Sequence, residues 1–277
     1  MSVEEATTDL FDPTTSPLQH FGHEVRLARE RVGMSRAELG THAHCGYSLV
    51  AKIEVGERVP TLYFAESCDR AFPHSYGRFE RLWQLVIKHA YPTWFRPWVV
   101  LEEAATAIRS FQVQLVPGLL QTEDYARAVL SCGRLTAERV EVLLTARMER
   151  QRILTRDTPP DLWAVLDENV LRRQVAPSKA FAGQLARLIE ESEKPSTLIQ
   201  VVPYGAGAHA GLGGPFSALT MEEGPDVLYV DGFAQGQILA DPEVVKAALR
   251  TYDLLQAVAL SPSASVDLIH TVMKELN

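Results

Sequence analysis

Tyr47, Ser48 and Lys52 carry side chains that can contact nucleic acid, and they lie close together in the sequence. Tyr47 can touch a thymine methyl group or donate through its hydroxyl, Ser48 can bond a base edge or a phosphate, and Lys52 suits a guanine acceptor or a phosphate oxygen. The small Ala51 allows a close approach. This is the chemistry of a recognition surface, provided that one helix presents these residues outward.

The elements that would position these residues are two short helices joined by a tight turn. Ser35 is the expected cap of the first helix, with Glu38 at the capping-box position three residues later. The second helix begins near Gly46 or Tyr47 and ends at Gly56. Three apolar residues mark the buried faces of the pair: Leu39, Val50 and Ile53. The pattern predicts a helix-turn-helix.

Further helices surround this pair. Four apolar residues recur at helical spacing before it and predict one buried face: Phe21, Val25, Ala28 and Val32. Gly33 ends that helix. Two more helical segments, from Leu62 to Ala71 and from Gly77 to Ala90, complete a compact all-helical module.

The segment resembles the phage-repressor-like (Xre) helix-turn-helix family, through the Ser-x-x-Glu-Leu opening at Ser35–Leu39 and the Ile-Glu-x-Gly-x-x-x-Pro close at Ile53–Pro60. The resemblance implies that the helix carrying Tyr47, Ser48 and Lys52 enters the major groove. Arg36 stands where that family usually presents a Gln to the DNA, so we expect it to contact a phosphate or a guanine. Arg58, just past the recognition helix, is placed for the DNA backbone.

The same resemblance implies structural roles for other residues. Arg29 and Glu54 are expected to form an ion pair that ties the first helix to the end of the recognition helix. Gly40 and Gly46 depart from the family's usual alanine and cap residue. Gly40 would permit a close helix crossing, whereas Gly46 would leave the recognition helix weakly capped.

Charge is distributed unevenly along the chain. The whole sequence carries a formal net charge of -8, which disfavours a protein that coats nucleic acid. Between Gln19 and Pro60, however, six basic residues stand against five acidic ones, a local charge of +1 that leaves -9 for the remainder. The first 17 residues are rich in Thr, Ser, Pro and acids, and we predict a flexible acidic tail that does not touch DNA.

The sequence disfavours membrane and metal sites. No uninterrupted apolar stretch approaches the ~18 residues of a membrane span, and the acidic opening is unlike a signal sequence, so a cytoplasmic protein is expected. Three cysteines without a CxxC pair indicate neither a disulfide framework nor a zinc site. We therefore expect no metal and no cofactor.

Beyond Pro92 the pattern becomes mixed, and the predicted fold class is α+β: an N-terminal all-helical domain and a larger mixed α/β domain. Five apolar runs predict strands: Ser110–Val116, Leu162–Asp167, Thr197–Val202, Phe216–Met221 and Val227–Val230. Five segments predict helices: Thr122–Cys132, Thr136–Leu154, Lys179–Ser192, Pro242–Leu260 and Pro262–Glu275. The expected division is a tail at 1–17, a DNA-binding domain at 18–91 and an effector, dimerisation or partner-binding domain at 92–277.

The second part resembles the C-terminal domain of actinomycete WhiJ-like or antitoxin-like Xre regulators, a domain without a settled biochemical function. The resemblance rests on motifs in a fixed order: Trp94–Glu102, Leu115–Arg127, Arg147–Leu154, Leu166–Arg173 and His209–Phe216. It implies a regulator often encoded beside a small partner protein.

An enzyme is not expected. Asp167 and Glu168 are adjacent carboxylates, but at a strand-to-helix junction such residues usually cap the helix. His209 lacks a second ligand or a nucleophile at suitable spacing and is interpreted as a surface residue. The glycine-rich loop Gly205–Gly214 has no phosphate-binding motif, although it could cover a small-molecule or protein site. The arginines of Arg147–Arg152 are interpreted as a solvated helix face.

Three hypotheses of function remain open. The leading one is a homodimeric transcription regulator that reads an inverted-repeat operator in double-stranded DNA. In the second, the acidic C-terminal domain binds a small basic partner protein, as an antitoxin does. In the third, that domain binds a small-molecule effector which alters operator affinity.

Overall fold

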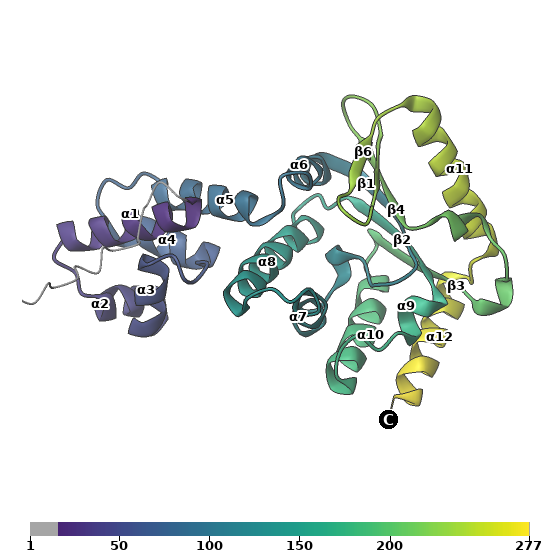
Figure 1. Cartoon of the computed structure of the whole chain (residues 1–277), viewed down its shortest axis with the longest axis horizontal. Helices are drawn as coiled ribbons and strands as arrows, with labels where there is room; N and C mark the ends of the chain where they lie inside the picture. The colour runs from purple at the N-terminus through teal and green to yellow at the C-terminus, as the bar shows by residue number, and fades with distance from the viewer. Residues whose placement is uncertain (1–15, 277) are drawn as a thin grey trace, which may run out of the picture. The chain divides into compact units, whose positions relative to one another are not determined.

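A computed structural model describes residues 16–276, which form two compact units. The first consists of the chain up to Tyr91 together with Thr136–Ala146, and the second of Pro92–Leu135 and Arg147 onward. Of the predicted tail, residues 1–15 lie outside the described residues, while Ser16 caps the first helix and Pro17 begins it. Figure 1 shows the elements along the chain.

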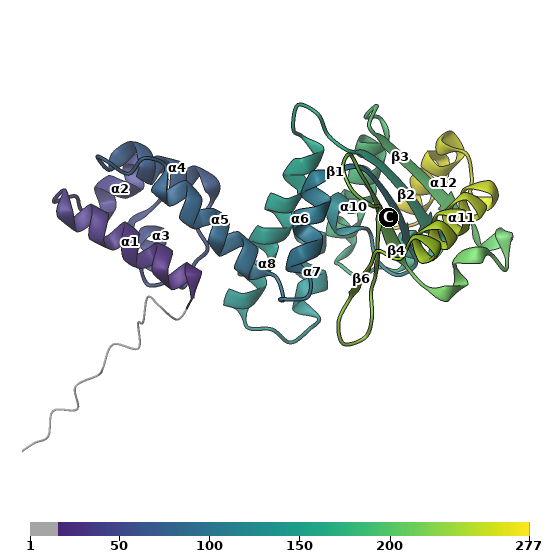
Figure 2. The same cartoon turned by 90° about the horizontal axis from the view of Figure 1, so that it is seen from above.

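The first unit is built around five helices, drawn from purple to blue in Figure 2. They are α1 (Pro17–Arg31), α2 (Arg36–His42), α3 (Tyr47–Glu54), α4 (Leu62–Ala71) and α5 (Arg78–Ala90). Side-chain caps begin several of them: Ser35 starts α2 with the predicted capping box, and the Thr61 hydroxyl accepts from Phe64 N at the start of α4.

Aromatic side chains fill the core of this unit. Phe21 of α1 meets Phe79 of α5 edge-on, with ring centroids 6.0 Å apart. Trp83 of α5 is buried, and its indole N–H donates to Pro60 O at 2.8 Å. One predicted core residue is wrong: Val32 caps the C-terminus of α1 and is 42% exposed, because the helix ends at Arg31 and its face turns away there.

The second unit contains a six-stranded mixed sheet of order β3-β2-β1-β4-β5-β6. Its strands are β1 (Ala105–Gln112), β2 (Asp161–Asp167), β3 (Thr197–Val202), β4 (Phe216–Met221), β5 (Val227–Val230) and β6 (Gln237–Leu239). β1, β2 and β3 are parallel, whereas β4, β5 and β6 pair antiparallel.

Helices cover both faces of this sheet, as its parallel half requires. The helices that follow Pro92 in the chain are α6 (Arg96–Ala104), α7 (Glu123–Ser131), α8 (Ala137–Arg150), α9 (Glu168–Arg172), α10 (Ser178–Ser192), α11 (Pro242–Val258) and α12 (Pro262–Glu275), and of these the first part of α8 belongs to the first unit. Figure 1 shows α10 and α11 on opposite sides of the sheet. Accordingly, Ile108 and Val201 pack with Leu185 of α10, while Phe111 packs with Tyr252 of α11.

The α+β fold class is confirmed, and four of the five predicted strands coincide with β2 to β5. The strand predicted at Ser110–Val116 is wrong in position, since β1 spans Ala105–Gln112 and begins directly after α6. The sequence also missed β6 and α6, whereas the start of α9 after Asp167 was expected from the strand-to-helix junction, without bounds for the helix. Four turns of 3-10 helix complete the unit: Gly118–Leu120, Gln151–Leu154, Tyr204–Ala206 and Ala210–Gly213.

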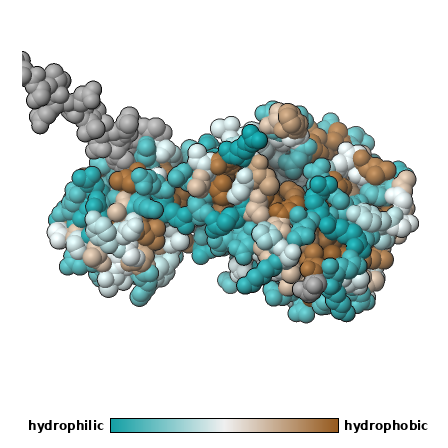
Figure 3. Space-filling view, turned by 60° about the horizontal axis from the view of Figure 1, so that its bottom comes forward, coloured by the Kyte–Doolittle hydropathy of each residue, from teal (hydrophilic) through white to brown (hydrophobic). Residues whose placement is uncertain are grey.

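Among the described residues, no helix has both the length and the apolar composition needed to cross a bilayer. On the face drawn in Figure 3, hydrophilic side chains are spread over the surface between smaller hydrophobic areas.

Candidate nucleic-acid interface

The turn between α2 and α3 depends on a glycine. The amide of Cys45 donates to Gly40 O at 2.8 Å, so the chain folds back directly onto α2. A Cβ atom at position 40 would lie 2.6 Å from the carbonyl oxygen of Cys45. His44 adopts a positive φ of 49° in the same turn. Gly40 therefore permits a close approach, but of the turn before α3 and not of a crossing helix as expected from the sequence.

A second glycine, which the sequence analysis missed, brings α1 against the end of α3. A Cβ atom at Gly22 would overlap the carbonyl oxygen of Ile53, which is backbone and has little room to move. Gly22 lies inside a helix beside the buried Phe21 and Val25. A helical glycine among core positions was the signal available in the sequence.

Glu54, at the C-terminal end of α3, is the electrostatic centre of the module. Its side chain is 0% exposed and accepts from two arginines. The predicted pair with Arg29 is present, with Arg29 Nε 2.5 Å from Glu54 Oε1. Arg36 Nε donates to the other oxygen at 2.7 Å, an interaction that the sequence did not predict. The carboxylate thereby fixes both α1 and α2 to α3.

Arg36 is consequently a bridging residue. Beyond Glu54, its Nη1 donates to the Tyr47 hydroxyl at 3.3 Å, and its guanidinium lies 5.8 Å from the centre of that ring. The hydrogen bond to Glu54, followed by the one to Tyr47, raises the pKa of Arg36. The expected DNA contact of Arg36 stays a prediction; what the structure shows is that Arg36 orients Tyr47.

The remaining predicted residues of α3 share an accessible face. Tyr47 is 56% exposed, Ser48 and Lys52 are exposed, and Ala51 is half-buried. Within the described part of the chain, the Lys52 carbonyl accepts from Glu57 N and Arg58 N, whereas its ammonium group forms no hydrogen bond and no ion pair. Gly46 provides no side-chain cap, as expected. The face thus combines a phenol, a hydroxyl and a free ammonium group around a small residue.

Arg58 lies beyond α3 and already has a partner. Its Nη1 is 2.8 Å from Glu141 Oε2, where Glu141 belongs to the part of α8 that packs within the same unit. The Arg58 side chain is 41% exposed, so its guanidinium remains reachable from solvent. Arg58 is therefore close in sequence to the other predicted contact residues, but its guanidinium is already paired with the Glu141 carboxylate.

In the second unit, the carboxylates and the histidine considered for catalysis are held by internal bonds. Asp167 caps α9 and accepts from Asn169 N at 2.8 Å, as predicted. Glu168 pairs with Arg172 at 2.6 Å and accepts from Tyr204 N. The prediction of His209 as a surface residue is wrong: its side chain is 5% exposed, with Nε2 3.5 Å from Asp167 Oδ2. His209 closes the glycine-rich loop onto the end of β2.

The Arg147–Arg152 segment is likewise not a simple solvated face. Arg147 donates to Gln121 Oε1 at 2.7 Å, and Arg150 approaches the buried carboxylate of Glu102 at 3.0 Å. Only Arg152 keeps a largely exposed side chain. The difference arises because Gln121, just before α7, and Glu102 of α6 lie against this segment, which sequence spacing alone does not indicate.

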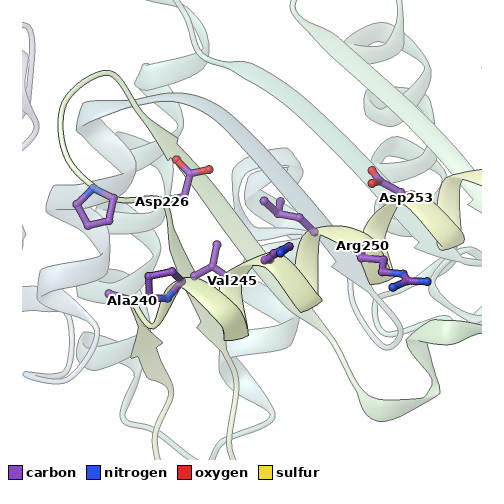
Figure 4. Close-up of a pocket in the computed structure, with 9 residues that line it drawn as sticks. Asp226, Ala240, Val245, Arg250 and Asp253 are labelled. Atoms are coloured by element: carbon purple, nitrogen blue, oxygen red, sulfur yellow. The ribbon is translucent and has the colours of Figure 1, made fainter.

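The second unit also contains an open pocket of about 500 Å³. Pro225, Ala240, Val245 and Leu249 supply apolar walls, and four charged side chains stand around them: Asp226, Lys246, Arg250 and Asp253. Figure 4 shows Asp226, which precedes β5, and Arg250, on α11, toward opposite ends of the pocket. Across residues 16–276, no group of three His, Cys, Asp or Glu residues could hold a metal ion.

Comparison with known proteins assigns the two regions separately. Residues 20–73 match the model of a helix-turn-helix domain, which indicates a DNA-binding regulator. No curated protein and no solved structure matches the chain. Residues 95–271, more than half of the chain, match the model described as "Domain of unknown function (DUF5753)". The chain therefore belongs to the DUF5753 family.

Proposed function

We propose that this protein is a sequence-specific DNA-binding transcription regulator that inserts α3 into the major groove. The observation that carries the proposal is the exposed face of Tyr47, Ser48 and Lys52 on a helix whose other side is fixed by Glu54. A rigidly held helix with hydrogen-bonding groups on its free face can read base edges. Ala51 leaves room for the approach, and Arg36 and Arg58 supply positive charge for phosphates.

The regulator would act in the cytoplasm as a homodimer on an inverted repeat. An eight-residue helix contacts only a few base pairs, and two half-sites about 34 Å apart multiply specificity. The resemblance to Xre regulators of the WhiJ-like or antitoxin-like kind supports this proposal. The same resemblance suggests that a small basic partner could bind the acidic remainder of the chain, and co-purification of such a protein would favour this antitoxin-like alternative.

The test is a fluorescence-anisotropy titration with DNA from the protein's own upstream region, at two salt concentrations. Lys52→Ala should weaken binding by about 1–3 kcal/mol, roughly ten- to a hundredfold, if Lys52 reads a base. Lys274→Ala, which removes the same charge from α12, is the matched control and should bind as the wild type does. Weak binding of equal strength by all three proteins would contradict the proposal.

The pocket beside α11 favours a small-molecule effector as a second candidate. Its volume lies within the range of ligand sites, ~300–1,000 Å³. The side chains of Lys246 and Arg250, one helical turn apart on α11, form no hydrogen bond or ion pair among the described residues and could hold an acidic group. A metabolite that raises the melting temperature of the wild type but not of a Lys246→Ala, Arg250→Ala variant would support it. In either case we propose a binding protein and not an enzyme.

A further inference from the structure

Part of the DUF5753 region belongs structurally to the DNA-binding unit. Thr136–Ala146 lies within the family match at 95–271, yet it packs with the helices before Pro92. Two hydrogen bonds hold it there: the Tyr91 hydroxyl donates to Ala146 O at 2.7 Å, and Arg139 Nη2 donates to Ala90 O at 2.8 Å. Val140 and Leu144 are buried. This segment is thus a packed part of the unit.

One face of the segment is acidic and lies beside the proposed DNA contact Arg58. Glu138 and Glu141 are three residues apart in α8, so they share one helix face. Glu141 holds Arg58 at 2.8 Å. The Glu138 carboxylate has a lowered pKa, mainly through a bond to its own amide and one to Thr136, with a further contribution from the charge of Lys52. Arg58 is therefore paired with one of these carboxylates, and Lys52 lies within electrostatic reach of the other.

A carboxylate and a DNA phosphate compete for the same guanidinium. Both present paired anionic oxygens to the donors of an arginine, so Arg58 cannot satisfy both with the same N–H groups. The Arg58 and Glu141 side chains are 41% and 21% exposed, which leaves their pair accessible to water and to exchange. An approaching phosphate would also meet the negative charge of Glu138 close to Lys52.

We propose that Glu141, assisted by Glu138, acts as an internal competitor of the DNA backbone and lowers the operator affinity of the helix-turn-helix. The inference rests on the proposed function. It assigns a role to residues for which the sequence offered none. Movement of Thr136–Ala146 away from Arg58 would raise the affinity.

The test is the anisotropy titration of the full chain carrying Glu141→Gln, which keeps the side-chain shape and removes the charge. We expect binding to tighten by roughly two- to fivefold, the range that corresponds to an exposed ion pair. The affinity should also fall more steeply with salt, because wild-type Glu141 recaptures a cation when Arg58 leaves it. Glu190→Gln, an exposed glutamate of α10, removes the same charge elsewhere and should leave affinity unchanged.

A double-mutant comparison separates this mechanism from a general charge effect. In an Arg58→Ala background, Glu141→Gln should lose most of its effect, because the group for which Glu141 competes is absent. A gain equal to that of Glu190→Gln, or an undiminished gain without Arg58, would overturn the inference. Operator binding that is lost in Lys52→Ala but unaffected by Glu141→Gln would overturn this inference alone. A wild-type chain without operator binding would overturn the proposed function as well.

Discussion

Replacing Glu54 with Gln should destabilise the DNA-binding unit through the arginines that it holds. The carboxylate is fully buried, and Arg29 beside it is only 10% exposed, so Arg29 would keep a buried charge with only the half-exposed Glu30, 3.6 Å away, as a counter-ion. Breaking such a pair typically costs about 3–5 kcal/mol. Two features reduce that figure here: Arg29 also donates to Met34 O at 2.8 Å, and Arg36, at 28% exposure, can be solvated by water. We expect a loss of about 2–4 kcal/mol.

Urea unfolding followed by circular dichroism at 222 nm measures this loss. Because the chain has two units, two unfolding transitions are expected. The transition that Glu54→Gln shifts to a lower urea concentration is that of the first unit, and its midpoint urea concentration is compared between variants. Glu57→Gln, an exposed glutamate just beyond α3, is the matched control and should change stability by less than about 0.5 kcal/mol. If Glu54→Gln cost no more than Glu57→Gln, the argument that a buried carboxylate organises the module would be refuted.

Three further substitutions test other parts of the structure. Gly40→Ala should cost about 1–3 kcal/mol in thermal unfolding and weaken DNA binding, since its Cβ would meet the backbone oxygen of Cys45; an increase in stability would contradict that contact. Ser35→Ala should cost about 1 kcal/mol by removing the capping box, whereas an unchanged melting temperature would show that the cap contributes nothing. Burial raises the pKa of Glu102 despite the nearby Arg150, so protonation on acidification favours the folded state. The stability of the wild type relative to Glu102→Gln should therefore increase as pH falls through the raised pKa towards the ordinary value of 4.5, and a difference independent of pH would refute this.

The helix-turn-helix could be predicted from the sequence because its signals are local. The capping box at Ser35, the glycine at Gly40 and the apolar spacing of α3 lie within a few residues of the elements they define. The second arginine on Glu54 could not be predicted in this way. Arg36 and Glu54 are 18 residues apart, and both look like surface charges until the helices are packed. Tertiary contacts decide which charge faces solvent.

The elements and contacts of the second unit were less predictable from the sequence than those of the first. Thr106, Arg109 and Ser110 interrupt the apolar pattern of β1, and their polar groups bond to β4 across the sheet, so the strand was placed too late in the chain. Arg150 was interpreted as solvated because its partner Glu102 lies 48 positions earlier. The packing of Thr136–Ala146 in the first unit also depends on residues far away in the sequence, so no local pattern predicts it.

The divided sequence of the first unit has a consequence for synthesis on the ribosome. Thr136 follows Tyr91 by 45 positions, so α1 to α5 leave the exit tunnel before the segment that packs on them has been translated. At about 5–20 residues per second, that delay lasts a few seconds. During this interval Tyr91 and Ala90 lack the partners that they have in the finished protein, and Arg58 lacks Glu141. The nascent chain therefore passes through a stage in which its recognition helix is complete and its acidic neighbour does not yet exist.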